Sequence, residues 1–93
     1  MILGIKLRPE MLEAIKADAQ KNDLSVPCWI SDAVCLHFKT EPNKIGHKYQ
    51  DTKYPDIRFR VSKITSRLLI GEATVRKIRK VDVIREAIAK CLA

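Results

Sequence analysis

Two clusters of basic side chains in the second half of the sequence are the residues best suited to bind a partner. Arg58 and Arg60 alternate with apolar residues, a period of two that places both arginines on one face of a strand. Their planar guanidinium groups are forks of hydrogen-bond donors that pair with acceptor-rich partners. Four cations in five residues follow over 76–80. Both clusters indicate an anionic partner.

The distribution of charge points the same way. The 93-residue chain has a net charge of +7. Residues 1–46 hold six Lys or Arg against six Asp or Glu, whereas residues 47–93 hold twelve against five. Basic charge alone also keeps proteins in solution, but an excess confined to one half favours a polyanion, and nucleic acid above all.

Other kinds of site find no support in the sequence. Three cysteines without C-x-x-C spacing argue against a disulfide framework and against the common zinc modules. A metal site of Cys28, Cys35, His37 and His47 fits no standard spacing, and we expect both of these cysteines to lie in the core. Neither histidine has a nucleophile or carboxylate partner at motif spacing. We therefore expect no enzyme activity, metal or cofactor.

The chain also lacks the signals of a membrane or secreted protein. No apolar run approaches the roughly 20 residues of a membrane span, and charged residues interrupt the start of the chain before a secretory signal could form. We expect a cytoplasmic protein.

The sequence contains an internal repeat. A shift of 54 residues, without a gap, superimposes the apolar residues of the first half on those of the second. It brings Leu3, Ile5 and Leu7 onto Ile57, Phe59 and Val61, and Ile30, Ala33 and Val34 onto Ile84, Ala87 and Ile88. The polar residues between the copies predict a linker over 40–55, which leaves one unit at 1–39 and another at 56–93.

Each unit predicts one strand followed by two helices. The strands are expected over 3–7 and 57–61, and in the first unit a break over 22–25 separates the helices. Ser25 and Ser62 are the expected helix N-caps. Because a lone strand leaves its backbone groups unpaired, we expect the two units to pair their strands as an antiparallel ribbon within one chain, giving a mostly helical fold.

Two further residues have expected structural roles. Trp29 falls on the apolar stripe of its helix and should lie in the core. Gly71 stands in the middle of a helix, where it costs about 1 kcal/mol relative to Ala, and predicts a close helix crossing.

Two short segments resemble a known family. Residues 5–10 (IKLRPE) are similar to its passage from strand to first helix, and residues 81–88 (VDVIREAI) to its second helix. The family is the ribbon-helix-helix family typified by the Arc, MetJ and CopG repressors, in which two units pair their strands over four interlocked helices. Two units in one chain resemble the tandem arrangement of TraY-type conjugation proteins.

The resemblance implies that the outward side chains of the ribbon enter the major groove of DNA and contact bases. By alternation these residues are Ile2, Gly4 and Lys6 in the first unit and Asp56, Arg58 and Arg60 in the second. The two strands differ in the base contacts that their side chains can make. Each arginine can pair with a guanine, whereas Gly4 reads nothing and Ile2 at most touches a thymine methyl.

The resemblance also implies a phosphate at the N-terminus of each second helix, where free N–H groups and the helix dipole favour an anion. The expected phosphate contacts are Ser25 and Val26 in the first unit and Arg76, Lys77, Arg79 and Lys80 in the second. Asp23 would repel a phosphate in the first unit. Lys44, Lys48 and Lys53 of the linker could add non-specific contacts.

The sequence thus predicts a sequence-specific protein for double-stranded DNA, most simply a transcriptional repressor. An accessory protein at a transfer or recombination origin and a DNA-binding antitoxin are the alternatives. Pairing of the two units within one chain leaves further self-association on DNA open.

Overall fold

The computed structural model describes residues 2–40 and 56–93 as four helices and two strands. In chain order they are β1 (Ile2–Lys6), α1 (Pro9–Lys21), α2 (Val26–His37), β2 (Asp56–Arg60), α3 (Lys63–Arg76) and α4 (Lys80–Leu92). The expected mostly helical fold with a short two-stranded sheet is confirmed. Apart from Thr40, the expected linker lies outside the described residues, and so do its three lysines, Lys44, Lys48 and Lys53.

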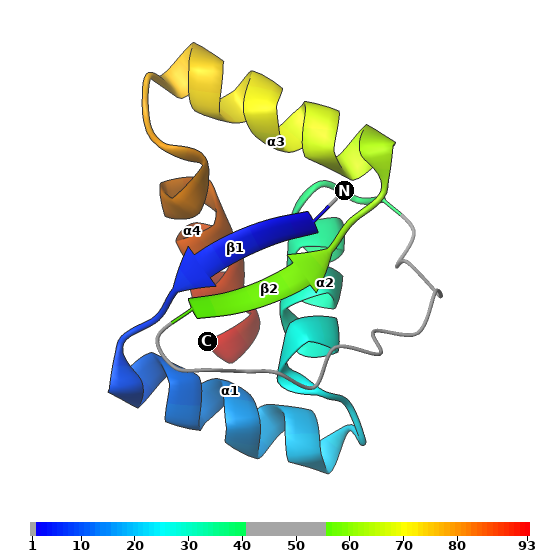
Figure 1. Ribbon diagram of the computed structural model, residues 1–93, viewed down its shortest axis with the longest axis vertical. Coiled ribbons are helices and arrows are strands. Elements are labelled where there is room, and N and C mark those ends of the chain that lie inside the picture. The colour runs from blue at the N-terminus through cyan, green and yellow to red at the C-terminus, as the bar shows by residue number, and fades with distance from the viewer. Residues whose placement is uncertain (1, 41–55) are drawn as a thin grey trace.

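The order strand, helix, helix occurs twice along the chain (Figure 1). Corresponding elements begin 54 residues apart, at residues 2 and 56, 9 and 63, and 26 and 80. Both strands begin one residue earlier than the alternation predicted. The reason is that the backbone ladder extends to the pair of Ile2 with Arg60 and to the pair of Lys6 with Asp56, whatever the side chains at its ends.

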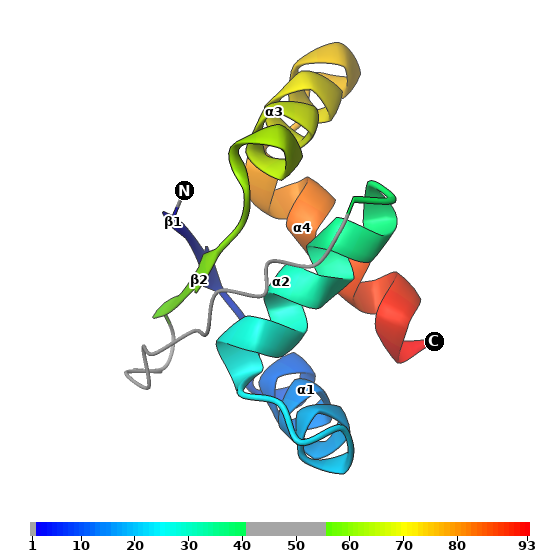
Figure 2. The same cartoon turned by 90° about the vertical axis from the view of Figure 1, so that its right-hand side faces the viewer.

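The two strands form an antiparallel ribbon, as expected. Its central pairs are Leu3 with Phe59, Gly4 with Arg58 and Ile5 with Ile57. Ile5, Ile57 and Phe59 are buried, because successive side chains of a strand point to opposite faces and these three face the helices. All four helices lie on this side of the ribbon, and none of them covers its other face (Figure 2).

The turns between paired helices have the same backbone in both halves. Asp23 and Lys77 adopt left-handed conformations, with φ of 56° and 55°. The N–H groups of Leu24 and Ile78, the residues that follow, donate to the carbonyls of Ala19 and Ala73 at 2.8 and 3.0 Å. These bonds close the ends of α1 and α3.

Serine side chains cap the N-termini of two of the helices. The Ser25 Oγ accepts from the Cys28 N–H at the start of α2, and the Ser62 Oγ accepts from the Thr65 N–H at the start of α3. Both expected N-caps are confirmed. In contrast, the N-cap residue of α4 is Arg79, which has no such short acceptor side chain.

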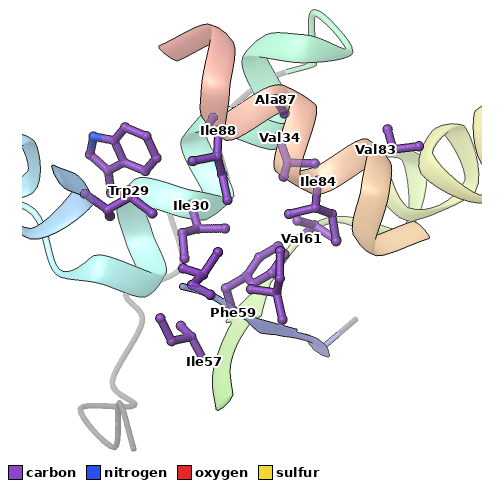
Figure 3. Packing of buried hydrophobic residues seen from close by; sticks show 14 of the residues in the cluster. Trp29, Ile30, Val34, Ile57, Phe59, Val61, Val83, Ile84, Ala87 and Ile88 are labelled. Atoms are coloured by element: carbon purple, nitrogen blue, oxygen red, sulfur yellow. The ribbon is translucent and has the colours of Figure 1, made fainter. Parts of the chain in front are cut away.

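The core lies between the ribbon and the crossed helices α2 and α4. Figure 3 shows Ile57 and Phe59 of β2 on one side of it and Ile30, Ile84 and Ile88 of the two helices on the other. All of these side chains are at most 2% exposed.

Trp29 lies at the edge of this core, beside α1. It is 5% exposed, and its indole Nε1 donates to the Asp18 Oδ2 at 2.7 Å. Its expected place in the core is confirmed, and the hydrogen bond satisfies its one polar atom.

Two expectations about packing were wrong. Gly71 is exposed, and a Cβ atom added to it would meet nothing within 4 Å, so no helix of the described chain crosses there. The reason is that α3 packs through its opposite side, which carries Leu69 and Ala73. Cys35 is buried, but Cys28 is only half-buried, because it stands in the first turn of α2. Burial, together with Asp32, raises the pKa of the Cys28 thiol.

Candidate nucleic-acid interface

The open face of the ribbon presents the residues that were expected to contact bases. Ile2 is 56% exposed, and Gly4, Lys6 and Arg58 are also exposed. Arg58 lies directly opposite Gly4 in the register, so no side chain across the ribbon crowds its guanidinium. The Arg58 side chain is therefore exposed on this face with no side chain opposite it.

Arg60 differs from Arg58 in its exposure, although the alternation in the sequence predicts the same outward position for both. It is half-buried, at the end of β2, and its carbonyl accepts a hydrogen bond from the Ser31 Oγ at 2.6 Å. The partial burial of its side chain, including the Nε atom, limits how far this arginine can move toward a base. The structure thus separates the two arginines into one that projects freely and one that is partly packed.

The ends of both strands are held by the second helix of the opposite half. Ser31 of α2 donates to the carbonyl of Arg60 in β2, and the Arg85 Nη2 of α4 donates to the carbonyl of Lys6 in β1 at 3.0 Å. Ser31 and Arg85 stand 54 residues apart, as do Lys6 and Arg60. These hydrogen bonds fix the ribbon relative to the helices and so orient its open face.

Sequence reasoning missed Ser31 and Arg85 as positioning residues. Arg85 lies inside the quoted VDVIREAI segment, so the repeat could have drawn attention to it. Ser31 carried no such signal, because only the 54-residue shift relates it to Arg85 and the two side chains share no chemistry.

The N-terminus of α2 has the geometry of an anion site. Ser25 is exposed, its Oγ caps the Cys28 N–H, and Pro27 carries no N–H. Of the first-turn donors that helix geometry leaves unused, the Val26 N–H and that of Ser25 itself remain. Two backbone donors at the positive end of a helix could hold one phosphate oxygen.

The N-terminus of α4 already holds a carboxylate. The Asp82 Oδ2 accepts from the backbone N–H of Arg79 at 3.2 Å and from its Nε at 3.3 Å. The hydrogen bond from the Arg79 side chain is the main cause that lowers the pKa of Asp82. A phosphate at this helix would compete with the carboxylate for the same donors. In the first half the corresponding residue is Cys28, which is uncharged at neutral pH.

The four expected phosphate cations of the second half divide into two pairs. Arg76 donates to both carboxylate oxygens of Glu86, at 2.6 and 2.7 Å, and lies 3.6 Å from a carboxylate oxygen of Glu72. Arg79 pairs with Asp82. Lys77 and Lys80 are exposed and have no ion pair within residues 2–40 and 56–93.

Arg76 therefore has a structural partner that the sequence did not reveal. Its fork joins the last turn of α3 to the middle of α4, and the hydrogen bond from Arg76 lowers the pKa of Glu86. A phosphate contact by Arg76 would have to be shared with this ion pair, whereas Lys77 and Lys80 can reach a phosphate without breaking one.

His37 has a carboxylate partner far from it in the sequence. Its Nε2 lies 3.1 Å from the Glu72 Oε2, and the Lys90 Nζ lies 3.4 Å from its Nδ1. The 35 residues between His37 and Glu72 hid this contact from a search at motif spacing. The His37 side chain is 8% exposed, so the contact links α2 to α3 in the interior.

Two kinds of arrangement are not found among the described residues. No three side chains of His, Cys, Asp or Glu gather there as a metal site would require, and none of the described helices is long and apolar enough to cross a bilayer.

Comparisons with known proteins return no match for this chain among family models, curated proteins or solved structures. The features that bear on function are therefore the geometry of the ribbon and the placement of charge around it.

Proposed function

We propose that this protein binds double-stranded DNA in a sequence-specific way, with the open face of the β1–β2 ribbon in the major groove. The observation that carries the proposal is this uncovered face, with Arg58 projecting from its centre opposite Gly4. A two-stranded ribbon fits the major groove, and an arginine there pairs with the O6 and N7 of guanine.

We further propose that residues 1–39 and 56–93 act as two ribbon-helix-helix units, joined by a linker over 40–55, that form one pseudo-dimer. The equal element spacing, the matched turns at Asp23 and Lys77 and the crossed hydrogen bonds of Ser31 and Arg85 support this arrangement. A pseudo-dimer supplies both strands from one chain, so it needs no second copy to complete its reading face.

The exposed cations beside the ribbon would hold the phosphates on either side of the groove. Lys77 and Lys80 in the second half, and the Val26 N–H in the first, are the groups that the described structure leaves available. Such contacts position a protein on the duplex and carry no base information.

The proposed biological role is transcriptional repression by occupation of promoter DNA. It rests on the proposed insertion of the ribbon in the major groove, by which the bound protein would occupy promoter DNA. Binding to the DNA upstream of its own coding sequence would support this role. Binding at a transfer or recombination origin instead would favour an accessory role.

Selection of bound sites from random duplexes tests the DNA-binding proposal directly. The wild type should enrich a defined sequence, and Arg58→Ala should lose preference at particular base pairs. Arg67→Ala is the matched control, because Arg67 is an exposed arginine of α3 away from the ribbon. Failure of the wild type to enrich any sequence would refute the proposal.

A further inference from the structure

An exposed apolar ridge runs along α3. Ile64 is 67% exposed, Leu68 43% and Val75 83%. With Gly71 they occupy spacings of four, three and four residues, which place all four on one stripe of a helix. We call Ile64, Leu68, Gly71 and Val75 the α3 ridge. Nothing in the described chain covers it, and three large apolar side chains exposed in line are unusual on a surface that only meets water.

The corresponding surface of α1 has the opposite character. At the positions of the ridge, α1 carries Glu10, Ala14, Ala17 and Lys21, all of them exposed. Because the side chains of Ala14 and Ala17 are small, the middle of this face projects less than its ends. Next to Ala17 the surface is hollowed into an open groove of about 470 Å³, lined by Glu13, Lys16, Gln20 and the chain at 24–26.

The ridge and the groove lie at opposite ends of the molecule. Figures 1 and 2 show α3 at one end of the long axis and α1 at the other, and Figure 1 shows the two helices crossing that axis in opposite directions. The long axis measures 34 Å. Copies stacked end to end along it would therefore bring α3 of one chain against α1 of the next, with the two helices antiparallel.

Charge favours this pairing over contact between two copies of α3. Lys63 and Arg67 of α3 are exposed, as are Glu10 and Glu13 of α1. Two α3 helices would bring cations toward cations, whereas exposed Lys16 and Lys21 of α1 balance its two acids, so α3 on α1 meets a face without excess positive charge. In the antiparallel arrangement the acidic first turn of α1 also lies near exposed Lys77, at the end of α3.

We propose that the α3 ridge docks on the α1 face of a second copy of this chain, head to tail. The ridge side chains would cover the surface of Ala14 and Ala17 and enter the groove beside them. Because the two surfaces differ, the contact does not close on itself and can repeat into rows. This contact would form without DNA, and a phosphate bound at Ser25 and Val26, which also line the groove, would compete with it.

The contact is expected to be weak in solution. Three apolar side chains and the rim around them bury much less than the ~800 Å² per partner of a stable complex. We expect chains to associate at roughly 0.1–1 mM and to be single in dilute solution.

Two variants that each block one surface test the proposal by complementation. Leu68→Ala with Val75→Lys removes the ridge and introduces the residues that α1 has at these positions, so the fold should tolerate it. Ala17→Arg fills the opposite face. Ile70→Lys is the control, because Ile70 is an equally exposed apolar residue of α3 outside the ridge, and α1 has a lysine at its position.

Molar mass would be measured over a range of concentrations by sedimentation, with circular dichroism and melting temperature to check the fold. The wild type and the control should increase in mass at high concentration. Each blocked variant alone should keep the mass of one chain, and an equimolar mixture of the two should form a two-chain species and nothing larger.

Two outcomes would overturn the proposal. A two-chain species of Ala17→Arg alone would mean that α3 pairs with α3. A wild type that keeps the mass of one chain at 1 mM would mean that the ridge binds no second copy. If the double variant fails to fold, Ile64→Glu replaces it, because Glu10 is the corresponding residue of α1.

Discussion

Residues 2–40 and 56–93 build the same three elements with different surfaces. Their strands, helices and turns correspond at a spacing of 54 residues, and their inward residues are apolar in both. Outside the core they diverge: α1 has two alanines between two charged residues where α3 has a ridge, and Asp23 stands where the second half has Lys77. The halves thus share an apolar frame and a turn geometry, while the charge on their surfaces differs.

The N-termini of α2 and α4 also correspond to each other, but they differ as anion sites. The third residue of α2 is Cys28, and that of α4 is Asp82. A carboxylate stabilises the start of α4 through the helix dipole and the hydrogen bonds to Arg79, but it occupies the place that an incoming phosphate would take. The half with more positive charge therefore has the less accessible helix N-terminus.

The largest effect should come from the core that both halves share. Phe59→Ala should lower the free energy of unfolding by about 3–5 kcal/mol, and Ile5→Ala, at the corresponding position, by about 2–5 kcal/mol. Chemical denaturation followed by circular dichroism measures both. Each variant should still unfold in one transition, because the ribbon needs a strand from each half. Separate unfolding transitions for the two halves would show that they do not share one core.

Next in size are the substitutions on the open face of the ribbon. Arg58→Ala should weaken specific DNA binding by about 1–3 kcal/mol. Lys6→Ala should cost less, because an ammonium lacks the bidentate fork. Gly4→Ala should be tolerated, since its Cβ would lie 4.0 Å from the nearest atom outside the adjacent residues, the Ile57 carbonyl oxygen. Titrations against a selected duplex give these values, and equal losses from the two strands would contradict an unequal reading face.

The salt dependence of binding should separate the two pairs of cations. Lys77→Ala with Lys80→Ala should flatten the slope of log affinity against log salt by about 2, because each lost phosphate contact removes about 0.9. Specificity should survive. Arg76→Ala with Arg79→Ala should flatten it less, because both arginines already pair with carboxylates. Binding measured at four or more salt concentrations decides between the pairs, and identical slopes for the two double variants would count against the division.

Acid should weaken the fold through the second half. The pKa values of Asp82 and Glu86 are lowered by their hydrogen bonds to Arg79 and Arg76. Their ionised forms thus stabilise the folded state at neutral pH. That contribution is complete above the ordinary values of 3.8 and 4.5 and is lost as the pH falls through the lowered ones.

The double variant Asp82→Asn with Glu86→Gln should therefore lose less stability than the wild type as the pH falls below about 4.5. Thermal unfolding between pH 7 and pH 2 measures it. Glu13→Gln, which removes an exposed carboxylate of the first half, is the control. A wild type and a double amide variant with parallel curves would show that these ion pairs do not govern acid stability.

The smallest effect concerns a position where the halves differ by one methyl group. Gly71 corresponds to Ala17, and both are exposed within helices. Gly71→Ala should raise the free energy of unfolding by about 0.5–1 kcal/mol, because the added Cβ meets no other atom within 4 Å. Equilibrium unfolding in dilute solution, where chains are single, measures this difference. A destabilised variant would point to a constraint on α3 that the isolated chain does not show.

Much of the fold was predictable because it depends on periodicity. The alternation around Phe59, the helical spacing of Leu12 and Ile15, and the serine N-caps each express a local rule, and the 54-residue repeat allowed one half to check the other. The close crossing expected at Gly71 failed because a glycine in a helix does not reveal which face meets a neighbour.

The candidate site was less predictable, because ion pairs depend on how helices are placed in space. The sequence presents Arg76, Lys77, Arg79 and Lys80 as one cluster, but the turn directs two of them toward carboxylates of α3 and α4. The partial burial of Arg60 and the contact of His37 with Glu72 have the same origin. Both involve a contact between residues of opposite halves. Such a contact cannot be read from spacing along the chain.

The crossed hydrogen bonds at the strand ends also bear on how the chain folds during synthesis. Lys6 of β1 is held by Arg85 of α4, and within residues 2–40 and 56–93 the strand β1 pairs with β2 alone. During synthesis, β1 must therefore wait until β2 and α4 have left the ribosome before its contacts can be completed. Until then, β1 exposes an unpaired edge to other nascent chains. Fast translation through the segment between the halves would shorten this exposure, so the rate of synthesis, and not only the final stability, should influence the yield of correctly paired protein.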